Sequence, residues 1–363
     1  MGPTRNHAER RRIFLWVVLA CIALAVGYTF WGILRANASA SLMQAQGTPL
    51  PVAGANELES IQNQPHIVYL REVGPHYGEV TVAAIDGSSP KSLPTPLKCD
   101  RIYYAASSGI CLLYDTSTAA QNPLTHIPVW VTLFGSDFQP RHQFTIDGSP
   151  SRARLSPDGK YAAFTIFVTG HSYNDVNMST ATILLDTNTG ASLGNLEEFE
   201  TWKDGKLFQA PDFNFWGITF AQDSNRFYAT LRNGETIYLV QGDVAARKLT
   251  VLHEGVECPS LSPDGTRIAF KKRMGDRWQL TVLDLATMKE IPLAEKEDVD
   301  DQVEWLDNAR ILYQRANDDS QNWMSVFVVP ADGSGEPNIF LQNAASPAVI
   351  REQDIHRLSP SLN

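Results

Sequence analysis

The sequence lacks the short motifs that identify common metal and nucleotide sites. It contains no Cys-x-x-Cys pair and no His-Glu-x-x-His segment, the usual ligand patterns of zinc sites. It also contains no glycine-rich phosphate loop. We therefore predict no metal site and no cofactor, and the sequence singles out no catalytic residue, so a role other than catalysis is expected.

Positive charge is scarce outside the N-terminal segment. The formal net charge is −10, but residues 1–35 carry a net charge of +4, so the remainder carries −14. An acidic body repels phosphate backbones, which excludes nucleic acid as an expected partner. Hydrophobic residues make up 43% of the chain, enough to bury a substantial core.

One long segment lacks charge altogether. Ile13 to Leu34 is an uncharged run of 22 residues, which at about 1.5 Å per residue spans a hydrocarbon core. Four arginines precede the run and one follows it, so the positive-inside bias places the N-terminus in the cytoplasm. We predict a cytoplasmic basic segment (1–12), a single transmembrane helix (13–34) and a body on the extracytoplasmic side of the cell membrane.

The alternative is a cleaved signal peptide, which would give a secreted protein. The segment ANASA (36–40) offers Ala-x-Ala cleavage sites, although the apolar run is longer than the usual roughly 7–15 residues. Residues 35–65 are rich in Ala, Ser, Gln, Gly and Pro, a composition typical of a flexible linker. Both alternatives place the body outside the cytoplasm.

A phrase repeats along the chain, as RLSPDG at 154–159 and SLSPDG at 260–265. Serine, proline and glycine suit the first, second and fourth positions of a type I turn between two strands. Aligned on the aspartate of the turn, related turns occur at Asp158, Asp223, Asp264 and Asp307, so successive turns lie 65, 41 and 43 residues apart. Repeats of roughly 40 residues with four strands each are typical of propeller blades.

Six such units predict an all-β fold, a six-bladed β-propeller over residues 66–363. Five blades that contain their own first strand are expected, over 101–146, 151–187, 214–253, 257–294 and 301–342, and the fourth strand of the blade at 151–187 is poorly defined. Residues 66–94 form a further blade that lacks its first strand, and we expect the C-terminal strand IHRLSPSL (355–362) to supply it. Joining both termini in one blade closes the ring and removes the free sheet edge.

The segments RLSPDGKYAAF and SLSPDGTRIAF resemble the repeat of the TolB-like, WD40-like (PD40) propellers. The resemblance covers about residues 66–360, and membrane-anchored proteins of this kind are common in actinobacteria. It implies a six-bladed fold and a binding role, and it carries over no catalytic residue. The chain shows no additional N-terminal domain of the kind that the Tol-system protein has.

Long loops are expected on one face of the propeller, which we call the distal face because both chain ends lie on the other. Loops carry function more often than scaffolds do. Aromatic side chains beside polar groups suit a sugar, a peptide or a protein surface. The candidate ligand-binding residues are His171, Tyr173, Asn174, Asp175, Trp202, Phe213 and Trp216. The alternative is a solvated loop whose aromatic residues pack over the end of a blade.

The innermost strands line the central channel. Arg152, Arg154, Gln302, Glu304 and Arg357 could face this channel, and hydrogen bonding between blades is their expected role.

Two of the four cysteines lie twelve residues apart in a compartment that permits disulfides. A hairpin turning at Ser107–Ser108 would put Cys111 opposite Tyr104 rather than Cys99. A Cys99–Cys111 bond therefore requires a bend or bulge after Cys99, and the sequence leaves its formation open.

The leading hypothesis is a non-catalytic, membrane-anchored, extracytoplasmic propeller that binds a protein or a cell-envelope component. The first alternative is a propeller enzyme, a hydrolase or lyase acting on peptides or glycans, with a site assembled from distant loops. The second alternative is a purely structural module of a larger envelope complex.

Overall fold

The computed structural model describes residues 54–85, 92–115, 128–170, 172–175, 177–317 and 323–358. The predicted transmembrane helix, most of the linker and His171 lie outside these ranges. Among the helices within them, none has the length and apolarity of a membrane span. The chain divides into two units, and the second, residues 50–73 with 78–363, contains every sheet considered below.

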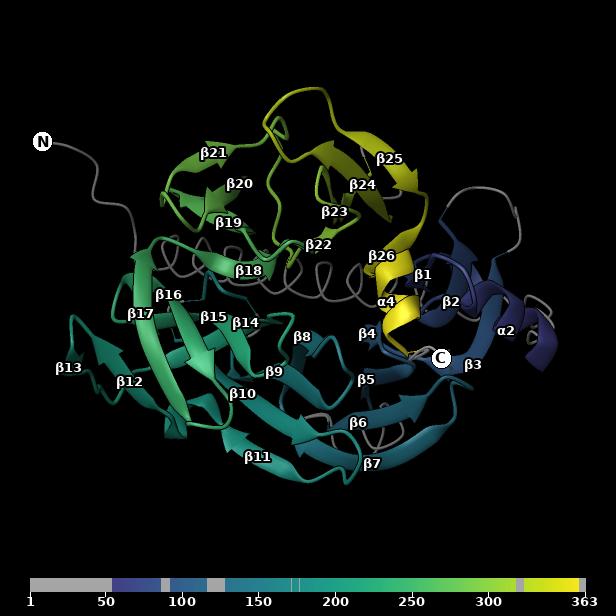
Figure 1. Ribbon diagram of the computed structural model, residues 1–363, viewed down its shortest axis with the longest axis horizontal. Coiled ribbons are helices and arrows are strands. Elements are labelled where there is room, and N and C mark those ends of the chain that lie inside the picture. The colour runs from purple at the N-terminus through teal and green to yellow at the C-terminus, as the bar shows by residue number, and fades with distance from the viewer. Residues whose placement is uncertain are drawn as a thin grey trace, which may run out of the picture. The chain divides into compact units, whose positions relative to one another are not determined.

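Six sheets of this second unit are arranged around a central axis as the blades of a β-propeller (Figure 1). Blade 1 contains β26 (Ala344–Ile350), β1 (His66–Arg71), β2 (Glu79–Ala84) and β3 (Leu93–Lys98). Blade 2 contains β4 (Arg101–Ala105), β5 (Ser108–Tyr114), β6 (Pro128–Gly135) and β7 (Pro140–Asp147). Blade 3 contains β8 (Ser149–Leu155), β9 (Tyr161–Thr169), β10 (Ser179–Asp186) and β11 (Ser192–Asn195).

The remaining blades follow in chain order around the axis. Blade 4 contains β14 (Asn214–Phe220), β15 (Arg226–Asn233), β16 (Thr236–Asp243) and β17 (Lys248–Glu254), extended at its outer edge by β12 (Glu200–Lys203) and β13 (Lys206–Leu207). Blade 5 contains β18 (Glu257–Leu261), β19 (Arg267–Met274), β20 (Arg277–Asp284) and β21 (Glu290–Pro292). Blade 6 contains β22 (Glu304–Trp305), β23 (Arg310–Ala316), β24 (Met324–Pro330) and β25 (Asn338–Leu341). Six blades and an all-β fold are as predicted.

The core lies between neighbouring blades. One cluster joins Ile110 and Leu112 of blade 2 to Phe164 and Ile166 of blade 3, all of them buried. Each central strand therefore has apolar neighbours on both faces, which explains why its sequence is a continuous apolar run rather than an alternating one.

The serine and aspartate of the repeated phrase hold its turn together. Ser156 Oγ donates to Asp158 Oδ1 at 2.6 Å and accepts from the Tyr161 N–H at 2.9 Å. Ser262 and Asp264 form the same pair at 2.6 Å. Burial acts to raise the pKa of Asp264, but hydrogen bonds from Ser262 and Thr266 outweigh it and lower that pKa to about 2. The repeated phrase thus forms the same hydrogen-bonded turn between the innermost strand of a blade and the strand that follows it.

The prediction that IHRLSPSL closes the ring is wrong. The strand beside β1 is β26, with His66 opposite Ile350 and Val68 opposite Ala348. Only two residues separate β26 from the outer strand of blade 6, so the chain passes directly into the vacant innermost position. Ring closure by a C-terminal strand is therefore correct, but the strand lies about ten residues earlier than predicted.

The segment predicted to be that strand begins with a short helix instead, α4 (Glu352–Leu358). Its first turn contains Glu352 and Asp354, and acidic residues are favoured at a helix N-terminus. Asp354 Oδ2 also accepts the Arg351 N–H at 3.0 Å. Arg357, predicted to face the channel from a strand, lies in this helix.

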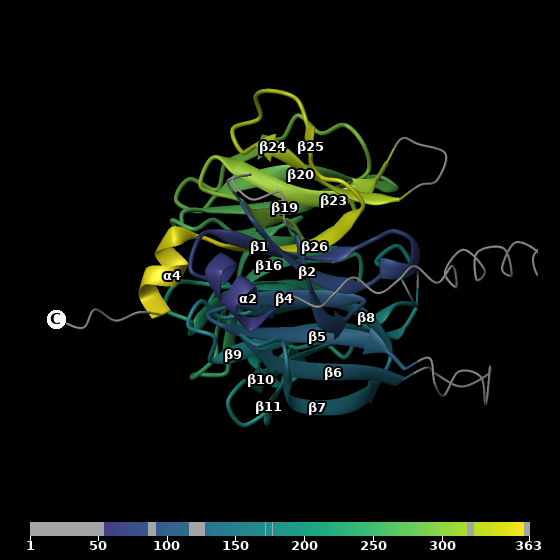
Figure 2. The ribbon, with the colours of Figure 1, turned by 90° about the vertical axis from the view of Figure 1, so that its right-hand side faces the viewer.

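A second helix, α2 (Ala55–Gln62), leads into β1, so both helices lie at the face where the chain enters and leaves the propeller (Figure 2).

Cys99 and Cys111 form a disulfide. The β4–β5 hairpin pairs Cys111 with Ile102 rather than with Tyr104, because the turn lies at Ala106–Ser107, where both residues have positive φ. Cys99 lies in the connection from β3 to β4. The disulfide therefore ties the link between blades 1 and 2 to a central strand of blade 2.

Removing this disulfide should lower the free energy of unfolding. For a closed loop of this length, the restriction of the unfolded chain is worth about 3 kcal/mol. We expect the Cys99→Ser/Cys111→Ser variant to unfold at a correspondingly lower urea concentration, measured by tryptophan fluorescence. Reductant should destabilise the wild-type chain and leave the variant unchanged, whereas equal midpoints for the two chains would contradict the stapling role.

Candidate functional site

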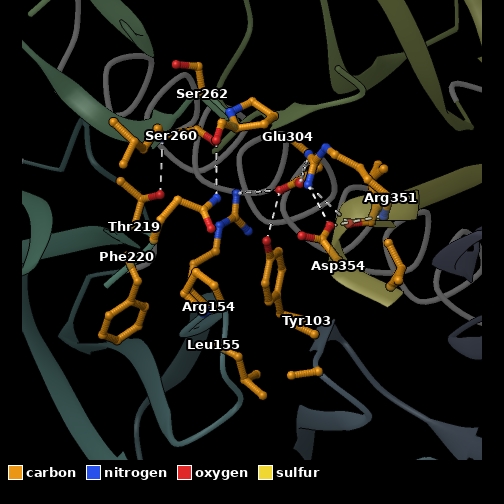
Figure 3. Close-up of a pocket in the computed structure, with 18 residues that line it drawn as sticks. Tyr103, Arg154, Leu155, Thr219, Phe220, Ser260, Ser262, Glu304, Arg351 and Asp354 are labelled. Atoms are coloured by element: carbon orange, nitrogen blue, oxygen red, sulfur yellow. Dashed lines mark hydrogen bonds and ion pairs between the residues drawn. The ribbon is translucent and has the colours of Figure 1, made fainter. Parts of the chain in front are cut away.

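The innermost strands of the blades end together at a small cavity beneath α4, which we call the channel mouth (Figure 3). Its volume is about 70 Å³, and side chains from all six blades line it. The polar lining is formed mainly by Tyr103, Arg154, Thr219, Ser260, Glu304, Arg351 and Asp354. The turns after β4, β8, β14 and β18 form its rim, so the mouth opens on the face that also contains both helices.

A buried carboxylate organises the channel mouth. Glu304 is 4% exposed, and its Oε1 lies 3.0 Å from Arg351 Nη2. Its Oε2 lies 3.7 Å from Arg154 Nη2 and accepts a hydrogen bond from the Tyr103 hydroxyl at 3.3 Å. Burial raises the pKa of Tyr103, and the neighbouring Glu304 raises it further, so this hydroxyl stays protonated and donates. One carboxylate thus joins strands from blades 2, 3 and 6 to the end of β26.

Blade-to-blade hydrogen bonds continue along the channel. Gln302 Nε2 donates to the carbonyl oxygens of Ile218 and Pro259 at 2.8 and 2.9 Å. Arg154 Nη2 donates to the Val303 carbonyl at 2.8 Å, and its guanidinium lies 4.5 Å from the centre of the Tyr103 ring. These contacts are the hydrogen bonds between blades that the sequence predicted for the channel-lining residues.

The opposite end of the channel contains two of the predicted ligand-binding residues, and both are buried. Tyr173 is 3% exposed and Trp216 is fully buried, with their rings 4.9 Å apart. The Tyr173 hydroxyl shares a 2.5 Å hydrogen bond with Ser151 Oγ. A ligand would therefore reach neither ring unless the loop that contains Tyr173 moved. The alternative interpretation, aromatic side chains packed over a blade end, describes these two residues.

The loop containing Tyr173 connects β9 to β10 within blade 3 and contacts Arg273 of blade 5. Asn174 is exposed and its Oδ1 accepts from Arg273 Nη1 at 2.5 Å, while Asp175 Oδ2 accepts the Ser172 N–H at 3.0 Å. Below them lies a group that we call the distal cluster, formed by Arg152, Tyr173, Glu257, Lys271, Arg273, Trp278 and Asp300. Lys271 is fully buried, pairs with Asp300, and lies 4.0 Å from the Trp278 ring centre. The distal cluster ties blades 3 and 5 across this end of the channel.

The other two predicted residues lie elsewhere. Part of residues 195–213 forms β12 and β13 at the outer edge of blade 4. Trp202 lies on β12, half-buried, with Lys248 Nζ 4.8 Å from its ring centre. Phe213 packs edge-on against Phe208 at 5.0 Å. The predicted set is thus spread over a loop, a sheet edge and the core, and the structure does not bring it into one cluster.

Sequence reasoning missed Arg351 and Asp354 of the channel mouth. Both follow the strand that was not recognised, so no expected element placed them near the channel.

Residues 190–194 (GASLG) match the Gly-x-Ser-x-Gly spelling of a nucleophile elbow. Ser192, however, begins the edge strand β11, and its Oγ accepts the Gly194 N–H at 3.2 Å, so the strand–turn–helix context of that motif is missing. Within the described residues, no three His, Cys, Asp or Glu side chains are grouped to hold a metal ion.

Glu72, at the other end of β1 from His66, has a perturbed carboxyl group. Burial raises the pKa of Glu72 to about 7, with Arg101 lowering it and Asp100 raising it. The folded chain therefore binds this proton more tightly than the unfolded chain. The resulting stability is fully present below pH 4.5 and is lost as the pH rises through about 7.

We therefore expect Glu72→Gln to be more stable than the wild-type chain at pH 8 by about 1–2 kcal/mol, after allowance for partial exposure. The difference should shrink to about zero at pH 4. Urea unfolding of both chains across this range tests the prediction, and a difference independent of pH would contradict it.

Comparison with known proteins identifies the fold. No family model matches the sequence. No curated protein matches it either. TolB from Acinetobacter baumannii superimposes with a TM-score of 0.53 at 17% identity, over 79% of this chain and 67% of that chain. A chain of a nidogen/laminin complex gives a TM-score of 0.51 at 11% identity, over 78% of this chain and 98% of that chain. A putative TolB from Agrobacterium tumefaciens gives 0.46 at 12% identity, over 77% of this chain and 88% of that chain. At these identities the likeness concerns the fold alone, and this chain has the fold of an all-β, six-bladed, TolB-like propeller.

Proposed function

We propose that the chain is a non-catalytic binding propeller that recognises a protein or a cell-envelope component at its channel mouth. One observation carries the proposal: all six blades, together with the residues after β26, contribute to this one cavity. A site built this way combines charged groups with apolar walls, as recognition sites generally do. The TolB-like fold supports a protein-binding role by analogy.

The chemistry of the channel mouth favours binding over catalysis. Its deepest carboxylate, Glu304, is held by two guanidinium groups and a tyrosine hydroxyl. A carboxylate in that position is committed to structural ion pairs and is poorly placed to accept a proton from a substrate. The alternative, a hydrolase or lyase acting on peptides or glycans, predicts turnover when the purified chain is screened with such substrates. Turnover would overturn the non-catalytic proposal.

We further propose that residues 13–34 anchor the propeller in the cell membrane, with the body extracytoplasmic, as a PD40-type propeller of the kind common in actinobacteria. The uncharged run and the arginines before it support this proposal. The chain enters and leaves the propeller at the same face, since His66 pairs with Ile350. An anchor before the linker would turn that face, with the channel mouth, towards the membrane.

Site-specific photo-crosslinking of the full chain in its native membranes tests the binding proposal. Gln222 lies exposed on the rim of the channel mouth, whereas Met274, at the end of β19 on the distal face, is 48% exposed and serves as the matched control. A photoreactive residue at position 222 should give a defined adduct that position 274 does not. The reverse result would favour the distal face, where Asn174 and Asp175 lie. Adducts at neither position would contradict a binding role.

A further inference from the structure

We propose that the channel mouth recognises an acidic side chain followed by an aliphatic one, and that α4 occupies it as a built-in copy of that ligand. The copied pair is Asp354 and Ile355. The partner is then a peptide segment with the same acidic–aliphatic chemistry, and it binds by displacing α4. This inference rests on the proposed function, because it names the partner chemistry and the regulation of the same site.

Asp354 supplies the acidic half of the pair. Its Oδ2 lies 3.4 Å from Arg351 Nη1, and Arg351 Nη2 in turn contacts Glu304. Figure 3 shows the Asp354 carboxylate next to the Arg351 guanidinium, at the edge of the cavity. The carboxylate thus completes an alternating row of charges that runs from Arg154 through Glu304 and Arg351.

Without Asp354 the channel mouth would carry excess positive charge. Two guanidinium groups, those of Arg154 and Arg351, would then face one carboxylate, that of Glu304. In addition, Arg351 Nε is buried and has no hydrogen-bond partner. A guanidinium with a free N–H at this position can accept a carboxylate in a two-point geometry. The mouth beneath α4 is therefore complementary in charge to an acidic side chain.

Ile355 supplies the aliphatic half. It is half-buried and packs against the core cluster that joins α2 to blades 1 and 2, which includes Leu58, Ile61 and Ile350. An aliphatic side chain one residue after the acid reaches this apolar surface while the acid reaches Arg351. Among residues 352–356 of α4, whose side chains the structure describes, the adjacent Asp354 and Ile355 make the contacts with the propeller.

The outward side of α4, formed by Glu352, Gln353 and His356, contributes little to its attachment. Glu352 and His356 pair with each other at 3.7 Å, with side chains 79% and 75% exposed, and Gln353 is exposed as well. A helix of seven residues is marginal without tertiary contacts. Segments with few buried contacts open locally at low free-energy cost. Local opening of α4 would uncover the channel mouth without unfolding a blade.

The test uses the full chain and a fluorescein-labelled peptide with the sequence of residues 352–358, EQDIHRL. In the wild-type chain the tethered α4 competes at an effective concentration on the order of millimolar, so the peptide should bind weakly. The Asp354→Asn/Ile355→Ser variant should bind it at least about tenfold more tightly by fluorescence anisotropy. A peptide with Asn in place of its Asp should bind this variant at least about tenfold more weakly than EQDIHRL.

The matched control changes the exposed side of the same helix. The Glu352→Gln/His356→Ser chain should bind the peptide as weakly as wild type. Equal affinity of the wild-type and Asp354→Asn/Ile355→Ser chains would overturn the proposal, and so would equal affinity for the two peptides. If the chain is a dimer that the peptide dissociates, the mouth binds α4 of a second copy, and the proposal of an external partner is overturned. If the double variant does not fold, Asp354→Asn alone supplies the same comparison.

The outcome separates this inference from the proposed function. Failure of the peptide to bind, with a defined adduct still formed from position 222, would remove only the idea of a built-in copy. If the peptide does not bind and position 222 forms no adduct, the channel mouth is not a binding site.

Discussion

The Ala348→Asp variant should lose more than about 4 kcal/mol of the free energy of unfolding. Ala348 is fully buried on β26, directly opposite Val68 of β1. A carboxylate at this position would be desolvated without a partner, which is among the most destabilising changes known for single residues. Because β26 joins the two ends of the ring, its loss would also leave β1 as a free sheet edge. Urea unfolding of the purified full chain, followed by tryptophan fluorescence, measures the effect.

The His356→Asp variant is the matched control. His356 belongs to the segment that resembles the repeat, but its side chain is 75% exposed on α4. A charge at this position should change the free energy of unfolding by no more than about 0.5 kcal/mol. If His356→Asp unfolded the chain and Ala348→Asp did not, the closing strand would be the C-terminal segment after all.

The repeated turns made most of the fold predictable from the sequence. Each turn contains a local signal, because Ser156 and Asp158, or Ser262 and Asp264, form hydrogen bonds within a few residues of each other. The closing strand has no such signal. Ser346 and Pro347 interrupt its apolar run, and the register with β1 shifts between Val68 and Leu70. A strand selected by a vacant edge almost 280 residues away cannot be recognised from its own sequence.

The candidate site was less predictable, for a related physical reason. Tyr173 and Trp216 have the composition of a recognition surface, yet both are buried, because the loop of Tyr173 folds back and stacks its ring on Trp216 of β14. Arg351 and Asp354 are ordinary charged residues in the sequence. They acquire a role only because the ends of β22, β8 and β26 meet, which brings Glu304 and Arg154 beside them. Composition predicts a loop's chemistry, but only tertiary contacts decide which side chains remain accessible.

The two ends of the channel differ in how they are closed. At the distal end, the fully buried Lys271 of blade 5 pairs with Asp300 and lies over the ring of Tyr173 from blade 3. At the channel mouth, the cover is a short helix that contacts the propeller through Asp354 and Ile355. A partner would meet less resistance at the mouth, since opening it breaks fewer buried contacts. This difference supports the proposal that recognition takes place at the mouth.

Glu257→Ala should destabilise the distal end by about 3 kcal/mol. Glu257 is fully buried, and its Oε1 accepts from both Trp278 Nε1 and Arg273 Nε at 3.0 Å. Truncation would leave a buried indole N–H without a partner and would release Arg273, which also holds Asn174 of the loop containing Tyr173. Hydrogen exchange of residues 172–175 should therefore accelerate in the variant, together with a lower urea midpoint.

Two further variants isolate the cause of this effect. Glu257→Gln keeps a carbonyl oxygen that can accept from Trp278, so it should recover part of the lost stability. Glu198→Ala removes an ion pair of similar length, 2.9 Å to Arg247, but that pair is exposed and should cost less than about 1 kcal/mol. Equal losses for Glu198→Ala and Glu257→Ala would show that burial does not set the strength of the distal cluster. The contrast in closure between the two ends of the channel would then have no energetic basis.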